Sequence, residues 1–172
     1  GSNPAEARRR IECAMSAQQV DLVTRQFESQ LAHYTSEKRG ARDSRIVSFL
    51  AQAYEADASL NSAGVLRVCE FGGADGILLA SIGERLGGEA ELVNAELVEA
   101  FARRQATPSI RFVPTSILDA AFPAQAFDVV IARHVLHHLI ADTLVGTRYN
   151  QARAFQELAR ITRPGGLVLI EE

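Results

Sequence analysis

The sequence is short of cysteine, of proline and of long apolar runs, and each shortage excludes a class of protein. Two cysteines, Cys13 and Cys69, are too few and too far apart in sequence for a zinc cluster or a disulfide scaffold. We therefore expect reduced thiols, a cytoplasmic location and no metal site. With only 5 prolines and 12 glycines, the composition is not that of a collagenous or disordered chain.

Membrane segments and leader peptides are not indicated either. No stretch reaches the roughly 18 consecutive apolar residues that a membrane-spanning helix needs. The basic residues 8–10 are not followed by the apolar core of a signal peptide. We expect a soluble chain that has no membrane partner.

What remains is a globular composition, with 47% apolar and 23% charged residues in a chain of 172. At roughly 150 residues per domain, this length predicts one compact unit with a substantial core. The 18 basic and 21 acidic residues give a net charge of −3, which provides no basic field to attract nucleic acid. We therefore expect no nucleic-acid partner.

The spacing of apolar residues divides the chain into a helical first part and a mixed second part. Residues 4–60 carry apolar side chains at helical intervals, and Ser44 is a candidate N-cap for a helix there. From residue 65 onward, short apolar runs cover residues 65–71, a stretch that ends at Ala95, and residues 110–113, 127–132 and 167–170. Because these runs are almost wholly apolar, they predict strands that are covered on both faces, as in a doubly wound, mostly parallel α/β sheet.

Helical periods separate the predicted strands. The first of them ends at the glycines of residues 87–88. The last halts at Pro164, and its predicted buried side contains Ala152, Phe155, Leu158 and Ile161.

A glycine-rich turn follows the first predicted strand and opens a helix, in the segment Glu70, Phe71, Gly72, Gly73, Ala74, Asp75, Gly76. Glycine there lets the backbone turn tightly and lets a ligand approach the peptide N–H groups at the start of the helix. In a doubly wound sheet, nucleotides bind at this place. A turn that only packs the helix on the strand would have the same sequence, so the turn alone leaves both interpretations open.

The segments around this turn resemble the class I S-adenosylmethionine-dependent methyltransferases. The first motif of that family, an acidic residue followed by Gly-x-Gly-x-Gly, is matched by Glu70, Gly72, Ala74 and Gly76, with alanine at the middle glycine. The acidic residue that closes the second strand in the family is matched by Glu96, twenty residues past Gly76. Further matches lie in the same order at residues 127–130, 134–139 and 160–166.

The resemblance implies a Rossmann-like methyltransferase fold with strands one to five present, the C-terminal strands missing, and an N-terminal helical lid. The lid would cover residues 4–60, and the S-adenosylmethionine-binding domain would cover residues 61–172. The resemblance assigns Glu96 to the two ribose hydroxyls of the cofactor, because a carboxylate can accept both. The other implied cofactor contacts are Glu70, Phe71, Gly72, Gly73, Ala74 and Gly76 around the methionine portion, Leu97, Ser116 and Ile117 around the adenine, and also Arg133 and Tyr34.

Two segments depart from the family or match it loosely. After the third strand the family often carries Gly-Asp, with the Asp on the adenine amino group, whereas this chain has Thr115 and Ser116. Ser116 can still hydrogen-bond adenine, more weakly. Asp119, three residues on, is an alternative partner for the adenine, although we favour the interpretation that it is plain surface charge. In the first part of the chain, residues similar to the family's lid pattern are Phe27, Leu31, Ala32 and Tyr34, with Arg39 and Arg42 as further candidates. A helical pair that packs on the sheet edge would give the same pattern.

The chemistry implied by the resemblance is a direct displacement at a sulfonium, for which the protein mainly aligns donor and acceptor and excludes water. A hydroxyl acceptor must also lose its proton, and His137 falls where similar small-molecule O-methyltransferases place their base. His137 or His138 could instead simply cap or pack the following helix. We predict S-adenosylmethionine-dependent methyl transfer to a small-molecule acceptor, with oxygen, nitrogen and carbon all open.

Two other functions stay open. One is a methyltransferase-like subunit that binds the cofactor but is non-catalytic or needs a partner chain. The other is an NAD-dependent oxidoreductase, whose Gly-x-Gly-x-x-Gly spacing would put Ile77 where the third glycine lets the helix approach closely.

The last predicted strand raises a question about partners. Residues 167–170 are apolar on both faces, as in an interior strand, and the sequence ends two residues later. Alone, this strand would present an unpaired apolar edge. We expect it to be covered by further chain, by a partner subunit, or by a second copy in a homo-oligomer.

Overall fold

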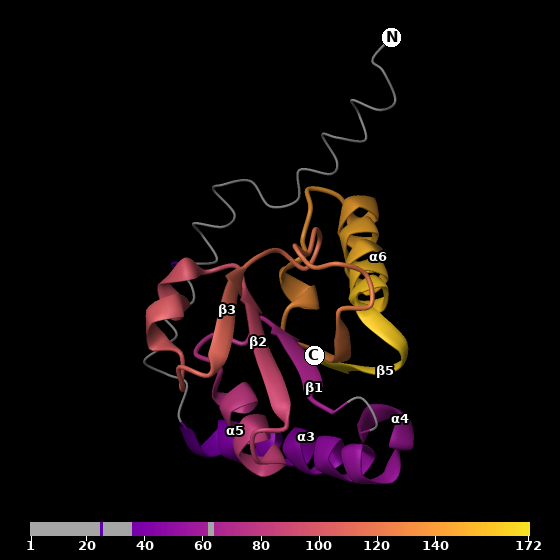
Figure 1. The fold of residues 1–172 in the computed structure, drawn as a ribbon. Coiled ribbons are helices and arrows are strands. Elements are labelled where there is room, and N and C mark those ends of the chain that lie inside the picture. Colours follow the sequence, from indigo (N-terminus) through magenta and orange to yellow (C-terminus); the bar gives the residue numbers. More distant parts are fainter. Residues whose placement is uncertain (1–24, 26–35, 62–63) are drawn as a thin grey trace.

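The computed structural model describes residue 25, residues 36–61 and residues 64–172, and it contains a single parallel sheet (Figure 1). The sheet order is β3-β2-β1-β4-β5. The strands are β1 (Leu66–Phe71), β2 (Ala90–Glu96), β3 (Ile110–Pro114), β4 (Phe127–Arg133) and β5 (Thr162–Glu171). The helices are α3 (Ser36–Ala56), α4 (Ala58–Asn61), α5 (Ile77–Leu86) and α6 (Leu144–Ile161), with two 3-10 turns, η1 (Glu99–Arg104) and η2 (Leu136–His138). The predicted doubly wound α/β sheet with strands one to five is confirmed.

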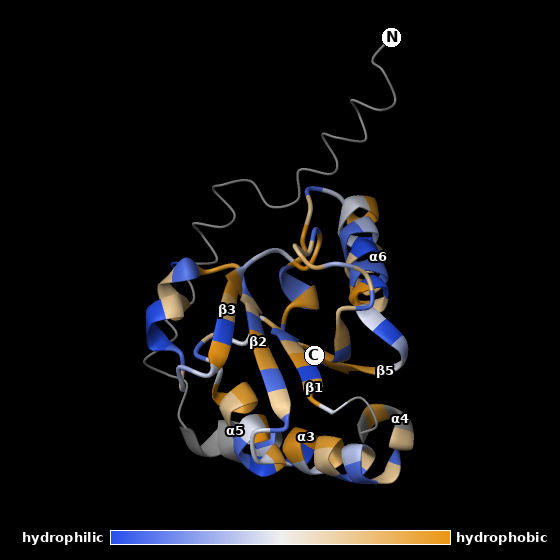
Figure 2. Ribbon diagram, viewed as in Figure 1, coloured by the Kyte–Doolittle hydropathy of each residue, from blue (hydrophilic) through white to orange (hydrophobic). Residues whose placement is uncertain are grey.

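Side-chain alternation along the strands divides the core into two layers, one on each face of the sheet. In β1, Leu66 and Val68 pack in the layer with α3 and α5, whereas Cys69 and Phe71 pack in the layer with α6. Figure 1 shows α3 and α5 together on one side of the sheet and α6 on the other, and Figure 2 shows hydrophobic segments interrupted by hydrophilic ones along the strands between them. Because both faces of the central strands are buried, apolar residues predominate in β1, β2 and β4.

Helix α3 lies on the sheet as part of the first layer. Ile46, Leu50 and Ala53 pack with α5 and the strands, and Leu60 of α4 joins the same cluster. The helix begins at Ser36, so the predicted N-cap at Ser44 is wrong, because Ser44 lies inside the helix. The remaining residues of the predicted lid pattern, which are Phe27, Leu31, Ala32 and Tyr34, lie outside the described residues.

Helix α6 begins with a side-chain cap and ends three residues before the predicted stop. The Oγ1 atom of its N-cap, Thr143, accepts a hydrogen bond from Gly146 N at 3.0 Å. The helix ends at Ile161 rather than at Pro164, because β5 starts at once at Thr162. The buried side consists of Asn150, Ala154, Leu158 and Ile161.

The predicted buried side of α6 was therefore partly wrong. Leu158 and Ile161 are buried as predicted, but Ala152 is exposed and Phe155 is 48% exposed. Successive residues are rotated by about 100° around a helix, so a stripe through Ala154 turns its neighbour Phe155 away from the sheet.

Asp128, the polar residue in an otherwise apolar strand, is paired with two arginines at the amino end of the sheet. Its carboxylate accepts hydrogen bonds from the backbone N–H of Arg67 at 2.7 Å and from the guanidinium groups of Arg67 and Arg163. Burial alone would raise the pKa of Asp128, but these hydrogen bonds hold it below its ordinary value. The ionised Asp128 thus fastens β1, β4 and the start of β5 at the end of the sheet opposite to the glycine turn.

The topology predicts where a ligand would bind. β1 and β4 are neighbours, but the chain continues from β1 to one side of the sheet and from β4 to the other. Such a switch point opens a crevice at the carboxyl ends of the strands.

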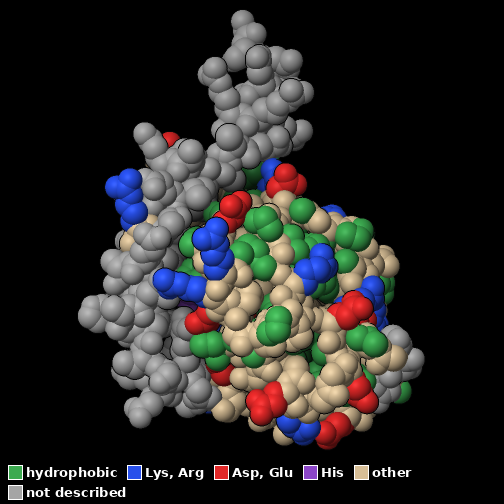
Figure 3. All heavy atoms as spheres, turned by 60° about the vertical axis from the view of Figure 1, so that its left-hand side comes forward, with side chains coloured by type: hydrophobic (Ala, Val, Ile, Leu, Met, Phe, Trp, Pro, Cys, Tyr) green, Lys and Arg blue, Asp and Glu red, His purple; other side chains and the backbone are tan. Residues whose placement is uncertain are grey.

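Every described helix is too short or too polar to cross a lipid bilayer. On the face in Figure 3, acidic and basic side chains of the described residues are interspersed among hydrophobic ones.

Candidate active site

The turn between β1 and α5 has the backbone conformation that its glycines suggest. Gly72 and Gly76 have φ angles of 71° and 74°, and Ala74 between them has a φ of 48°. A Cβ atom on Gly72 would lie 2.5 Å from Cγ2 of Val135, in the segment after β4. Ala74 therefore occupies a left-handed conformation that costs an alanine roughly 1 to 2 kcal/mol, and that a glycine would adopt without this strain.

Glu96, at the carboxyl end of β2, lies against this turn. Its Oε2 atom accepts a hydrogen bond from Ala74 N at 3.1 Å, and its Oε1 atom accepts one from Val98 N at 2.9 Å. Burial raises the pKa of Glu96, and the hydrogen bonds from the Val98 and Ala74 amides oppose that shift. Leu97 follows Glu96 at the same edge and is half-buried.

Asn94, two residues before Glu96 in β2, is a site residue that was not predicted from the sequence. Its Nδ2 atom donates to Ala74 O at 2.9 Å and to Gln105 Oε1 at 3.0 Å. Gln105 Nε2 in turn donates to the same Ala74 oxygen at 3.0 Å. The signal in the sequence is an amide side chain inside an apolar stretch of the strand. Asn94 is fully buried there, and a buried amide needs hydrogen-bond partners.

A buried charge cluster joins the ends of β1 and β4 to α3. Arg133 Nε lies 3.0 Å from Oε1 of Glu70, and Arg133 Nη1 lies 2.6 Å from Oδ1 of Asp43. Glu171 Oε2, at the end of β5, is 3.8 Å from the same Nη1 atom. Burial raises the pKa of Glu70 to about 7, although the charge of Arg133 opposes that shift. Three carboxyl groups thus share one guanidinium, an arrangement that favours an additional positive charge.

Buried acceptor atoms in this region lack hydrogen-bond partners among the described residues. They are Oε2 of Glu70, Oδ1 of Asn94 and Oε2 of Glu171. A Cβ atom on Gly73 would lie 2.6 Å from the Asn94 atom and 2.9 Å from the Glu70 atom, so both acceptors converge on the glycine turn. Unpaired buried acceptors are costly, and a ligand bound at the glycine turn could supply donors to them.

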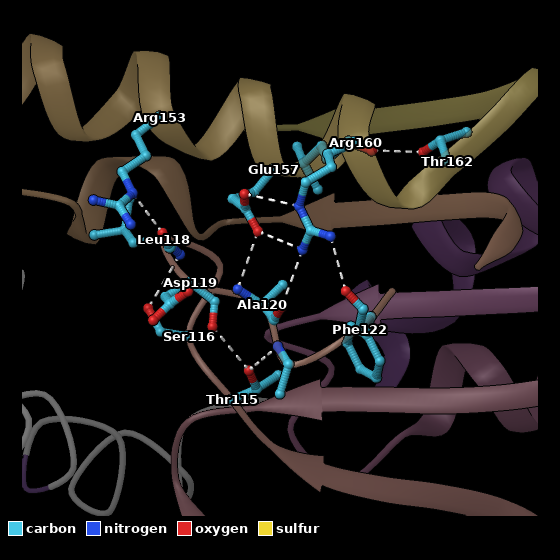
Figure 4. Close-up of polar contacts among 12 residues, drawn as sticks. Thr115, Ser116, Leu118, Asp119, Ala120, Phe122, Arg153, Glu157, Arg160 and Thr162 are labelled. Carbon is cyan, nitrogen blue, oxygen red and sulfur yellow. Dashed lines mark hydrogen bonds and ion pairs between the residues drawn. The ribbon is translucent and has the colours of Figure 1, made fainter. Parts of the chain in front are cut away.

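The loop after β3 contains Ser116 and Ile117. The Oγ atom of Ser116 accepts a hydrogen bond from Leu118 N at 3.1 Å, and Ile117 is buried. Thr115 is buried as well, and its Oγ1 atom accepts from Ala121 N at 3.0 Å (Figure 4). Asp119 is exposed.

A histidine and a glutamate meet where β4 and β5 end. His137 Nδ1 lies 2.7 Å from Oε2 of Glu172, and Oε1 of Glu172 accepts from the backbone amides of Val135 at 3.1 Å and Leu136 at 2.7 Å. Burial would raise the pKa of Glu172, but the hydrogen bonds from His137 and these amides hold it below its ordinary value. An ionised carboxylate only accepts, so Nδ1 of His137 donates the hydrogen bond, and in a neutral imidazole the lone pair would then lie on Nε2. Half of the His137 side chain is exposed.

An apolar cavity of about 310 Å³ lies beside the charge cluster, between α3 and the ends of β4 and β5. Its walls include Ile46 and Phe49 of α3 and Leu169 of β5, and its charged lining residues are Arg45, Arg133 and Glu171.

Comparison with known proteins places this geometry in a family. The model of the family described as Methyltransferase domain matches residues 69–170, which is more than half of the chain. The chain belongs to this methyltransferase family. No curated protein matches it.

Solved structures with the same fold include two carbon methyltransferases. The methyltransferase domain superposes on the carbon methyltransferase CurJ with a TM-score of 0.60 at 17% identity, over 74% of this chain and 34% of that one. For the carbon methyltransferase DszA the TM-score is 0.59 at 19% identity, over 88% and 38%. For a putative methyltransferase from an antibiotic biosynthesis pathway of Anabaena variabilis it is 0.54 at 19% identity, over 73% and 44%. The chain thus spans less than half of the length of each.

In this methyltransferase domain, the fold gathers most of the residues predicted for the cofactor at one edge of the sheet. Glu70 and Phe71 end β1, the glycine turn follows, Glu96 ends β2, and Arg133 ends β4. The guanidinium of Arg133 is directed at Glu70 and Asp43. Ser116 and Ile117 follow β3 at the same edge, and His137 follows β4. Tyr34 lies outside the described residues.

Proposed function

We propose that this domain binds S-adenosylmethionine and transfers its methyl group to a small acceptor that first loses a proton to His137. The observation that carries the proposal is the contact between His137 Nδ1 and the Glu172 carboxylate, which leaves Nε2 as a base at the end of β4. When bound, the cofactor would supply a methyl group attached to a sulfonium sulfur. The sulfur leaves as a neutral thioether, so the leaving group needs no further activation.

The fit of the cofactor is supported by charge and by space. The carboxyl excess around Arg133 and the unpaired Oε2 atom of Glu70 suit a cationic ligand with an ammonium group. The Glu96 carboxylate lies beside the turn, where an adjacent pair of hydroxyls would find an acceptor. Ser116 and Ile117 are assigned to the adenine, and Gly72 to the close backbone approach.

For the acceptor, we favour an acidic C–H group, such as the carbon between two carbonyl groups. The imidazole would take this proton on Nε2. The bound cofactor would supply the methyl group that the resulting carbanion accepts, and the electron pair of the broken sulfur–carbon bond would leave with the thioether sulfur. A neutral imidazole is a base suited to weakly acidic protons near neutral pH, which supports a dicarbonyl or a phenol over a simple alcohol. The two carbon methyltransferases with the same fold support the carbon acceptor.

Proton exchange tests the base separately from methyl transfer. With S-adenosylhomocysteine bound, a 1,3-dicarbonyl compound in deuterated water should exchange its central hydrogens faster with wild-type protein than with His137→Ala, and Glu172→Gln should be intermediate. His138→Gln serves as the control in the neighbouring ring. Equal exchange in wild type and His137→Ala would remove the base from the proposal. Methylation of a phenol panel without any dicarbonyl product would move the acceptor to oxygen.

Binding tests the cofactor. A thermal-shift comparison should show that S-adenosylhomocysteine stabilises the domain and that nicotinamide dinucleotides do not. The reverse result would favour the oxidoreductase. Cofactor binding without turnover on any acceptor would favour the partner-dependent subunit.

A further inference from the structure

The loop after β3, residues 115–122, is connected to α6 by several polar contacts (Figure 4). Arg160 donates from Nη1 to Phe122 O at 2.9 Å and from Nη2 to Ala120 O at 3.1 Å. Glu157 Oε2 accepts from Ala120 N at 3.2 Å. Two neighbouring side chains of one helix thus fix three backbone groups of the loop.

A third side chain on the same side of α6 holds the middle of the loop. Arg153 Nε donates to Leu118 O at 2.7 Å. Arg153, Glu157 and Arg160 are spaced by four and three residues, which aligns them along one face of the helix. That face runs beside the loop in Figure 4.

Glu157 also fixes the orientation of Arg160. The two side chains form a forked ion pair, with Nε to Oε1 at 3.0 Å and Nη2 to Oε2 at 2.7 Å. The hydrogen bond from Arg160 holds the pKa of Glu157 below its ordinary value, and the same bond raises the pKa of Arg160. Both groups are therefore charged at neutral pH, and the fork can present its remaining N–H groups to the loop.

Apolar packing alone does not set the orientation of this loop. Ile117, Ala120 and Phe122 are buried in the layer of α6, and burial of this kind is not directional. The hydrogen bonds of Ser116 and Thr115 stay inside the loop. The contacts from α6 decide which way the loop's carbonyl and amide groups point, and hence where the Ser116 hydroxyl lies at the end of β3.

We propose that Arg160, held by Glu157, is a positioning residue for the adenine end of the cofactor site. It acts through the loop of residues 115–122 and touches neither cofactor nor acceptor. The inference rests on the proposed function, because it takes Ser116 and Ile117 as the residues that contact adenine. It predicts that α6 controls the affinity for the cofactor and the selectivity for its adenine nucleobase, while His137 controls the proton transfer.

Conservative variants test this role. Arg160→Lys keeps the charge and loses the fork, and Glu157→Gln keeps an acceptor for Ala120 N and loses the charge pair. We expect each to raise the Kd of S-adenosylhomocysteine by about tenfold for the loss of oriented contacts. We also expect a smaller preference for S-adenosylhomocysteine over its inosine analogue, in which hypoxanthine replaces adenine. Arg148→Lys, an exposed arginine on the same helix, is the control and should bind as wild type does.

A double-variant cycle separates positioning from general destabilisation. If Arg160 acts through the loop, Ser116→Ala should cost less affinity in the Arg160→Lys background than in wild type. Additive losses of affinity in the double variant would overturn the proposal. An unchanged Kd and an unchanged preference for adenine in both conservative variants would also overturn it. Faster hydrogen exchange of the Ala120 amide in these variants would not rescue it. Wild-type protein that failed to bind S-adenosylhomocysteine would overturn the proposed function and this inference together. Wild-type protein that bound the two analogues equally would overturn this inference alone.

Discussion

At the scale of single residues, the site is defined by carboxyl groups whose environments differ. Glu70 is completely buried beside one shared guanidinium, Glu96 accepts two backbone amides, and Glu172 is held by amides and a histidine. Burial raises the pKa of the first two groups, whereas hydrogen bonds lower the pKa of Glu172. Three residues of one type can therefore serve three purposes, which are the binding of a cation, the binding of hydroxyls and the orientation of a base.

Glu70 should make stability depend on pH. Its folded pKa of about 7 lies above the ordinary value of 4.5, so the folded state holds the proton more tightly than the unfolded chain. The protonated Glu70 carboxyl therefore stabilises the folded state, by on the order of 3 kcal/mol in the free energy of unfolding. This stabilisation is fully present below pH 4.5 and is lost as the pH rises through about 7. Urea unfolding at pH 5 and pH 8 should show a larger loss for wild type than for Glu70→Gln. Equal losses in the two proteins would contradict the raised pKa.

Glu96 should control cofactor affinity. Glu96→Ala removes a charged acceptor for a pair of hydroxyls and should cost about 1.5 to 3 kcal/mol, roughly a ten- to hundredfold higher Kd for S-adenosylhomocysteine by calorimetry. Because Glu96 also holds Ala74 N and Val98 N, the melting temperature should fall as well. Glu91→Ala, in an exposed position of the same strand, is the control. Wild-type affinity in Glu96→Ala would remove this carboxylate from the site.

At the scale of elements, the glycine turn and its neighbouring strands form one unit. The glycines of the turn are required for different structural reasons. At Gly73, the missing side chain makes room for the unpaired acceptors of Glu70 and Asn94. A turn selected only for helix packing would not need that space.

Gly73→Ala should therefore damage binding more than an equivalent change at a helix end. The new Cβ atom would lie within 2.9 Å of two buried polar atoms, and such crowding costs roughly 1 to 3 kcal/mol of stability. Gly87→Ala meets no heavy atom within 4 Å and bears only the strain of a φ of 64°, about 1 to 2 kcal/mol. Measured together, the two variants should lose similar stability, but only Gly73→Ala should lose affinity for S-adenosylhomocysteine. Equal affinities would show that the turn does not face the ligand.

The elements that could be predicted from the sequence are those whose pattern is local. The strands were found because burial on both faces makes them apolar runs, and the glycine turn was found because its residues are consecutive. The ten-residue β5 was predicted too short, because it begins at Thr162 and includes Pro164 and two glycines. Asn94 with Gln105, and His137 with Glu172, were not paired in advance, because each contact joins different elements, and the second spans 35 residues.

At the scale of the whole molecule, the sheet is well covered in its centre, whereas the edge strand β5 is partly exposed. β5 pairs with β4 alone among the described strands. Leu167 and Leu169 pack against the layer of α3 and α5, but Val168 and Ile170 on the other face are 39% and 40% exposed. An apolar edge strand with open hydrogen-bonding groups is a template for pairing with other chains.

We expect the outer edge of β5 to be covered in the functional particle, by further chain, by a second copy of the chain or by a partner subunit. The free N–H and C=O groups and the exposed Val168 and Ile170 side chains all gain from the same covering contact. If another chain provides this cover, size-exclusion chromatography with light scattering should give a mass above that of the monomer, and hydrogen exchange at residues 167–170 should be slow. Val168→Asp should reduce the assembly, whereas Val145→Asp, at an exposed apolar position of α6, should not. A soluble monomer whose β5 edge amides exchange freely, and which still transfers methyl groups, would show that the edge needs no cover.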